Sequence, residues 1–174
     1  MCRHHGKKSS SRKICTQMKQ RMDFVKAAPG AFEALLGMHK YLGRSGLDER
    51  LLDLVYLRVS QMNGCAMCID MHWKDLRNLG EDEQRLYMLN AWREFVGYSE
   101  RERAALEWAE AVTRLEHGEV PDNVYRQARE QFSETELANL TLAVAAINSW
   151  NRLNIAFRRE AGTYQPPKAA ARAQ

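Results

Sequence analysis

The residues of this chain whose spacing most suggests chemistry are Cys65, Cys68 and His72, which form a CxxCxxxH pattern. In a helix, which advances by about 100° per residue, these three positions fall on one narrow stripe. Two thiols one turn apart can close a disulfide, and an imidazole one turn further along can carry protons near neutral pH. The pattern therefore indicates thiol redox chemistry.

Two other interpretations of the same residues remain open. Cysteines spaced three apart on a helix are often small buried hydrophobic residues. A zinc site would need a fourth ligand, which Asp53 could supply, but three donors on one helical stripe fit tetrahedral coordination poorly. We therefore rank a metal site below both redox chemistry and a plain core, and expect neither a metal nor a cofactor.

The position of Cys65 in its helix favours a thiolate. Asn63 and Gly64 are typical of a turn, so Cys65 is expected at or near a helix N-terminus. The free N–H groups and the positive end of the helix dipole stabilise the anion that acts as nucleophile. This argument by itself makes Cys65 the attacking sulfur.

Asp53 is an acid among apolar neighbours and can orient the imidazole of His72. If the helices on either side of Asn63 and Gly64 fold back as an antiparallel pair, the two residues lie at comparable distances from the turn. Their positions along the pair then agree within about 3 Å. An Asp53–His72–Cys68 proton path is geometrically possible, with or without a bridging water.

The rest of the sequence predicts an all-α protein, because no segment alternates with a strand period. Capping boxes begin at Ser99 and Ser133, and Asp48 can cap a third helix. The expected helices cover about residues 29–42, 49–62, 65–79, 83–92, 100–115, a segment from 121, and 134–159. In the last of them Asn148, Asn151 and Asn154 recur at every third position, which favours interface packing over pocket lining.

Charge divides the chain into a domain and two tails. Seven basic residues precede the first acid, Asp23, so subtracting their charges from the net +4 leaves −3 for the remainder. A mildly acidic body argues against a nucleic-acid partner. We predict a disordered basic tail over residues 1–19, one domain over 20–164 and a flexible C-terminal tail over 165–174, with loose chain already from Gly162.

Four cysteines in 174 residues do not form a disulfide scaffold, and Cys2 and Cys15 lie in the predicted tail. The sequence shows no apolar secretory core. Its longest strongly apolar run, from Leu140 to Ile147, is too short for a membrane span. These features favour a cytoplasmic protein without a membrane partner.

The stretch from Leu57 to His72, with both cysteines, resembles the signature of AhpD-like alkylhydroperoxidases in the carboxymuconolactone decarboxylase family. The likeness extends over roughly residues 20–164. Further matching segments are residues 26–30, 83–87, 89–94, 99–106 and 146–154.

The resemblance implies an AhpD-like helical bundle, with the CxxC motif at the N-terminal end of a central helix, that assembles as a trimer or as a hexamer of three dimers. It implies a thiol-dependent hydroperoxide reductase of antioxidant defence, with Cys68 attacking the peroxide and Cys65 closing the disulfide. An external dithiol, on a lipoyl or thioredoxin-like protein, would reduce that disulfide. The family thus makes Cys68 the attacking residue, whereas the helix-dipole argument favours Cys65. We follow the family, because exposure to substrate can outweigh a modest advantage in thiolate stability.

The chain departs from the family pattern at Asp53, where the relay acid is usually Glu. The side chain is one methylene shorter, so its carboxylate could reach His72 directly or through a bridging water, and a weakened activity or a different relay stays open.

Two other functions stay open. One is a lyase or isomerase acting on a lactone such as carboxymuconolactone, which requires no dithiol. The other is a non-enzymatic redox-sensing oligomer that uses the same disulfide.

Overall fold

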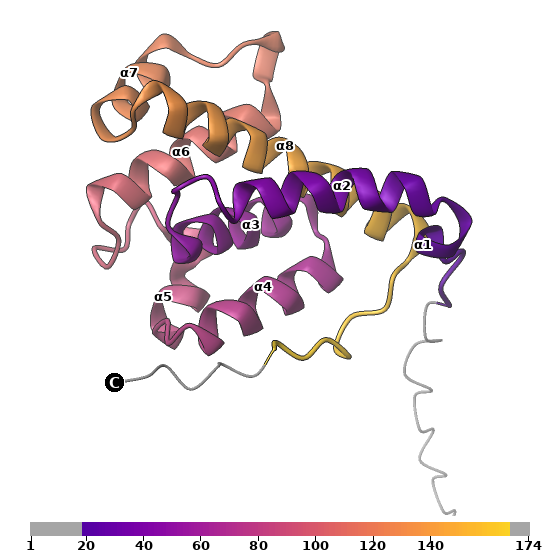
Figure 1. Cartoon of the computed structure of the whole chain (residues 1–174). Helices are drawn as coiled ribbons and strands as arrows, with labels where there is room; N and C mark the ends of the chain where they lie inside the picture. Colours follow the sequence, from indigo (N-terminus) through magenta and orange to yellow (C-terminus); the bar gives the residue numbers. More distant parts are fainter. Residues whose placement is uncertain (1–18, 168–174) are drawn as a thin grey trace, which may run out of the picture.

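A computed structural model of the chain describes residues 19–167, and every regular element within that range is helical (Figure 1). The all-α class is confirmed. The predicted tail over residues 1–19, with Cys2 and Cys15, lies outside the described residues except for Lys19. The α-helices are α1 (Phe24–Ala27), α2 (Pro29–Leu42), α3 (Glu49–Asn63), α4 (Ala66–Asn78), α5 (Glu83–Met88), α6 (Glu100–Arg114), α7 (Asp122–Gln131) and α8 (Glu134–Phe157); the 3₁₀ turns are Leu89–Ala91 and Glu116–Gly118.

The helix boundaries follow the capping signals of the sequence. Asp48 accepts a hydrogen bond from the backbone N–H of Leu51 at the start of α3. Both expected capping boxes are formed, by Ser99 at α6 and by Ser133 at α8. The region expected as one helix over 83–92 is α5 followed by a 3₁₀ turn, so the α-helix ends at Met88.

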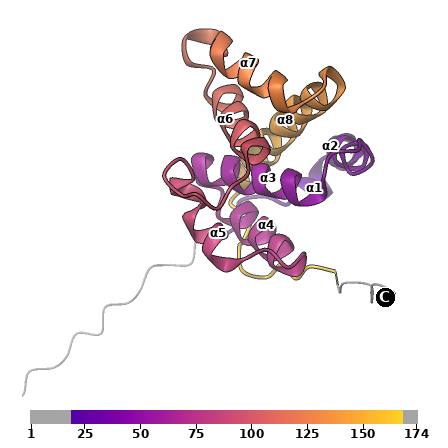
Figure 2. The same ribbon diagram turned by 90° about the vertical axis from the view of Figure 1, so that its left-hand side faces the viewer.

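Helix α3 lies at the centre of the molecule, with α6, α7 and α8 on one side and α4 and α5 on the other (Figure 2). One face of α3, with Val55 and Val59, joins the larger apolar cluster formed with α6 and α8. The opposite face, with Leu54 and Leu57, joins a second cluster with α4, α5 and Trp92. A helix buried on both faces in this way fixes the relative positions of the elements around it.

Glu110 is a buried carboxylate that ties α3 to the segment after α5. Its Oε1 accepts hydrogen bonds from Arg58 Nε (2.7 Å) and Trp92 Nε1 (2.8 Å). Its Oε2 faces Arg93 Nη1 at 2.9 Å and Arg114 Nη2 at 3.3 Å. Burial alone would raise the pKa of Glu110, but the hydrogen bonds from Trp92, Arg58 and Arg93 outweigh it, so the pKa lies below its ordinary value of 4.5.

The chain after α8 makes contacts that the sequence analysis did not anticipate, although residues 168–174 of the predicted C-terminal tail lie outside the described residues. Residues 162–167, expected to be loose, lie along α4 (Figure 1). Lys74 Nζ donates to the carbonyl of Tyr164 at 2.9 Å, and the Tyr164 hydroxyl donates to Asp75 Oδ1 at 2.6 Å. Further along, Asn78 donates to the carbonyl of Pro167 at 3.3 Å. We call residues 162–167 the C-terminal strap. Hydrophobic periodicity could not predict its position, because polar side chains of α4 hold it in place.

No helix within the described part of the chain combines the length and the apolar character needed to cross a membrane.

The first prediction concerns Glu110. Replacing it by Gln should lower the free energy of unfolding by about 3 kcal/mol, because the buried Arg58 loses its counter-charge. Replacing Glu107, a partner of the half-exposed Arg93, by Gln should cost less than about 1 kcal/mol. Urea unfolding at pH 7 measures both changes.

The Glu110 effect should also depend on pH. Since the pKa is lower in the folded protein than in the unfolded chain, the stabilisation is present above pH 4.5 and is lost as the pH falls below it. The difference in the free energy of unfolding between wild type and Glu110→Gln should therefore become smaller in acid. Equal stability of the two proteins at pH 7 would contradict the assignment.

Candidate active site

The two cysteines lie where α3 turns into α4. Gly64 adopts a left-handed conformation (φ 70°), and the next N–H, that of Cys65, donates to the carbonyl of Ser60 in a Schellman arrangement. Cys65 thereby becomes the N-cap of α4, as the sequence predicted, and Cys68 lies in its first turn. The two sulfurs form a disulfide, with the Cα atoms 5.4 Å apart. Both cysteines are buried.

Asp53 and His72 meet directly. The antiparallel packing of α3 against α4 places His72 Nδ1 3.0 Å from Asp53 Oδ1. Of the two alternatives, the contact is the direct one without a bridging water, because the two helices pack closely enough for the shorter side chain to reach. A carboxylate only accepts hydrogen bonds, so Nδ1 carries the proton. In the neutral imidazole, Nε2 is then free to accept one.

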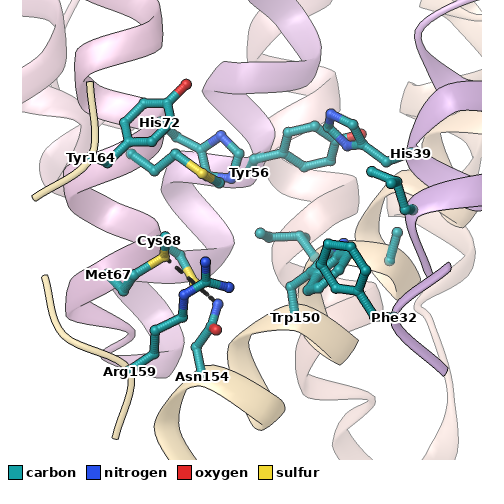
Figure 3. A pocket seen from close by; sticks show the side chains of 14 residues that line it. Phe32, His39, Tyr56, Met67, Cys68, His72, Trp150, Asn154, Arg159 and Tyr164 are labelled. Carbon is teal, nitrogen blue, oxygen red and sulfur yellow. Dashed lines mark hydrogen bonds between the residues drawn. The ribbon is translucent and has the colours of Figure 1, made fainter. Parts of the chain in front are cut away.

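A cavity of about 290 Å³ lies between α2, α4 and α8, next to the disulfide (Figure 3). Cys68 and His72 belong to its wall, whereas Cys65 does not. Most of the remaining wall is apolar or aromatic. These residues are Phe32, Leu36, Met67, Met71, Ala146, Ile147 and Trp150.

Three residues that line this cavity each carry a buried polar atom without a hydrogen-bond partner. These atoms are the hydroxyl of Tyr56, Nε2 of His72 and Oδ1 of Asn154, and within residues 19–167 they are the buried side-chain N and O atoms that lack a hydrogen bond. Burial raises the pKa of Tyr56, and the charge of Asp53 raises it further, so the phenol stays protonated. Leaving such groups unsatisfied costs about 1–3 kcal/mol each, which indicates a site for a small polar ligand.

Asn154 is a site residue that the sequence analysis placed mainly at an interface. Its Nδ2 donates to Cys68 Sγ at 3.3 Å, and its side chain lines the cavity. The other two asparagines also bond within the chain: Asn151 to Ser60 at 3.1 Å, and Asn148 to Asn63 at 2.9 Å. Asn151 and Asn154 are buried within the chain and so do not follow the interface assignment, which stays a prediction for the half-buried Asn148. The period of three was visible in the sequence, but the crossing of α8 over the start of α4 was not.

His39 of α2, to which the sequence analysis assigned no role, also lies at the site. Its ring lies 5.9 Å from that of Tyr56, and it lines the same cavity. Burial, and then the nearby His72, lower the pKa of His39, so it is neutral at pH 7. No sequence signal distinguished it from other residues of α2.

An acidic cluster lies behind His72. Ligand atoms of Asp53, His72 and Asp75 all lie within 4.8 Å of one another, beside a second cavity of about 280 Å³. Burial raises the pKa of Asp75, although the hydrogen bond from Tyr164 opposes this. Each acid in the cluster already has a protein partner, His72 for Asp53 and Tyr164 for Asp75. Asp53 therefore contacts the imidazole directly, whereas Asp75 contacts Tyr164 of the C-terminal strap.

Comparison with known proteins places this arrangement in a family. Residues 29–111 match the family model described as Carboxymuconolactone decarboxylase family. The uncharacterized YdfG of Bacillus subtilis is 43% identical over 84% of this chain and 99% of its own length. The uncharacterized YnjA of Escherichia coli is 30% identical over 66% of this chain and 62% of its own.

Solved structures agree with that placement. A protein of unknown function from Agrobacterium tumefaciens, suggested to be the antioxidant defence protein AhpD, superposes with a TM-score of 0.80 at 40% identity, over 84% of this chain and all of that one. A peroxidase-related protein from Ralstonia eutropha with an alkylhydroperoxidase AhpD core gives a TM-score of 0.71 at 20% identity, covering 80% of this chain and 74% of its own. The second likeness concerns the fold alone.

The second prediction concerns which thiol is reached first. In the reduced protein under native conditions, a limiting amount of iodoacetamide should modify Cys68 before Cys65, because Cys68 lines the cavity and Cys65 does not. Peptide mapping by mass spectrometry reads the order, with Cys65→Ser and Cys68→Ser as controls. Earlier modification of Cys65 would mean that the helix N-terminus decides reactivity.

Proposed function

The chain belongs to the carboxymuconolactone decarboxylase family, and we propose that it is an AhpD-like thiol-dependent hydroperoxide reductase. The observation that carries the proposal is the position of the reactive side chains at the wall of a cavity. Cys68 and His72 share the wall of an apolar cavity, Nε2 of His72 has no partner among the described residues, and Cys65 forms a disulfide with Cys68.

The first step is attack by the Cys68 thiolate on the terminal oxygen of a hydroperoxide. The S–O bond forms as the O–O bond breaks, and the electron pair leaves with the alkoxide. His72, which took the thiol proton at Nε2 directly or through a water, returns it to that alkoxide. The products are an alcohol and the sulfenic acid of Cys68.

The second step regenerates the disulfide of the structure. The sulfur of Cys65 attacks the sulfenic sulfur of Cys68, and the hydroxyl leaves as water with the proton of Cys65. An external dithiol then reduces the disulfide by thiol exchange and is itself oxidised. Over one cycle a hydroperoxide and a dithiol give an alcohol, water and an external disulfide. We propose a lipoyl or thioredoxin-like protein as that reductant.

Three neighbours support Cys68 as the attacking residue. The amide of Asn154 donates to its sulfur, which stabilises a thiolate. His72 supplies proton transfer, and the carboxylate of Asp53 holds its ring in the required tautomer. Cys65 has the better position relative to the helix dipole, but it does not line the cavity that a peroxide would occupy.

The homo-oligomer, trimer or hexamer, remains a prediction of the resemblance. A lactone lyase or isomerase would use no dithiol, so the Cys65–Cys68 disulfide beside a proton relay favours the reductase. A redox sensor without turnover would form the disulfide but would not consume peroxide repeatedly.

The third prediction tests the activity itself. With an excess of a small dithiol, the wild type should consume tert-butyl hydroperoxide catalytically, and Cys68→Ser should fall to the uncatalysed rate. After one equivalent of peroxide, Cys65→Ser should carry a sulfenic acid on Cys68, detectable by dimedone and mass spectrometry. Equal peroxide consumption by wild type and Cys68→Ser would refute the proposed function.

The fourth prediction tests the relay. Asp53→Asn keeps the size of the side chain but removes its charge, so the rate of Cys68 oxidation should fall roughly tenfold or more. Asp75→Asn is the matched control, because Asp75 bonds Tyr164 and not His72. The pH dependence of the rate should change in Asp53→Asn alone. A rate loss shared equally by both variants would show a general electrostatic effect rather than a relay.

A further inference from the structure

Resting on the proposed function, we propose that the cavity selects hydroperoxides that carry a carboxylate, with Arg159 as its anchor. The substrate class is an amphipathic acid, such as a fatty-acid hydroperoxide. Its apolar body would lie against the aromatic and aliphatic wall, and its peroxide group against Cys68.

Arg159 is held at the cavity by the way α8 ends. Arg158 adopts a left-handed conformation (φ 55°, ψ 51°), which turns the chain, and the N–H of Arg159 donates to the carbonyl of Asn154 at 2.9 Å. The side chain of Arg159 then points back toward Asn154 and Cys68 (Figure 3).

The guanidinium of Arg159 lacks a carboxylate partner within residues 19–167. Its recorded contact is with the ring of Phe24, 6.0 Å from the centroid. By contrast, Arg58 and Arg93 are both paired with Glu110. A planar guanidinium offers a fork of donors that matches a carboxylate in a bidentate pair.

The rest of the cavity adds no competing charge. None of the described residues that line it is acidic. Two of its residues are histidines, of which His39 has its pKa lowered by burial, and His72 has its Nδ1 bonded to Asp53. The charge at the wall therefore comes from Arg159, although the body of the chain is mildly acidic.

The other residues of the cavity wall indicate what the ligand carries besides its carboxylate. Phe32 of α2 and Trp150 of α8 meet edge to face, with ring centroids 5.7 Å apart. Together with Leu36, Met71 and Ile147 they form an apolar surface that suits a hydrocarbon body. The unpartnered atoms of Tyr56 and Asn154 offer a hydrogen-bond donor and an acceptor to a peroxide group.

The experiment compares one hydroperoxide with and without its charge. Reduced protein is mixed with linoleic acid hydroperoxide or with its methyl ester, below the concentration at which either forms micelles, and the single-turnover rate of Cys68 oxidation is measured. The flexible chain lets the carboxylate reach Arg159 from the bound peroxide. Wild type should prefer the acid by up to about fivefold, the upper end for a solvent-exposed ion pair, and less at high salt.

Three variants assign that preference to one side chain. Arg159→Gln should slow the acid alone and bring the ratio of acid to ester to one, and Arg159→Lys should retain part of the preference. Arg158→Gln removes the same charge from the neighbouring position, which does not line the cavity, and should leave the ratio unchanged.

The outcomes separate this inference from the function on which it rests. Equal wild-type rates for acid and ester overturn the carboxylate anchor but leave the reductase intact. A loss of both rates in Arg159→Gln also overturns it, because Arg159 would then act on the thiolate. If neither these compounds nor tert-butyl hydroperoxide oxidises Cys68, the proposed function itself fails.

Discussion

The structure depends on the reversal of the chain at Gly64. A left-handed residue there ends α3, and the following N–H completes the capping of the same helix, so α4 must return antiparallel along α3. This single turn fixes Cys65 as the N-cap of α4 and sets Cys68 one turn further along. It also brings Asp53 level with His72, since both then lie at similar distances from the turn. A side chain with a Cβ would be strained at this φ angle.

The scaffold around that turn is stiff where the candidate chemistry needs it to be. Helix α3 is covered on both faces, and the buried Glu110 links it to arginines and a tryptophan from other segments. A carboxylate with several donors is costly to desolvate but also intolerant of displacement, so it favours one arrangement. The candidate site uses other residues of α3, Asp53 and Tyr56, on the side of the helix where α4, α8 and the C-terminal strap converge (Figure 1).

The cavity combines apolar walls with buried polar groups. Its walls are largely apolar, yet three of its lining residues, Tyr56, His72 and Asn154, each carry a buried polar atom without a partner in the described chain. The positions of Cys65 and Cys68 explain why the helix-dipole argument and the family resemblance favour different cysteines. The dipole concerns the stability of a thiolate at Cys65, whereas access concerns which sulfur a substrate can meet. In the proposed function, access to the substrate makes Cys68 the attacking residue.

The sequence by itself determined the local features of this protein. Capping residues such as Asp48 and Ser133 located helix starts, and the spacing of Cys65, Cys68 and His72 placed them on one stripe, because both depend on contacts between near neighbours. Only the tertiary structure decided that Asp53 touches His72 directly, that Asn154 bonds the sulfur of Cys68, and that His39 and Arg159 reach the cavity. These contacts join residues from different helices or from the chain beyond them. Their distances are set by helix packing and by the path of the chain after α8, neither of which leaves a periodic trace in the sequence.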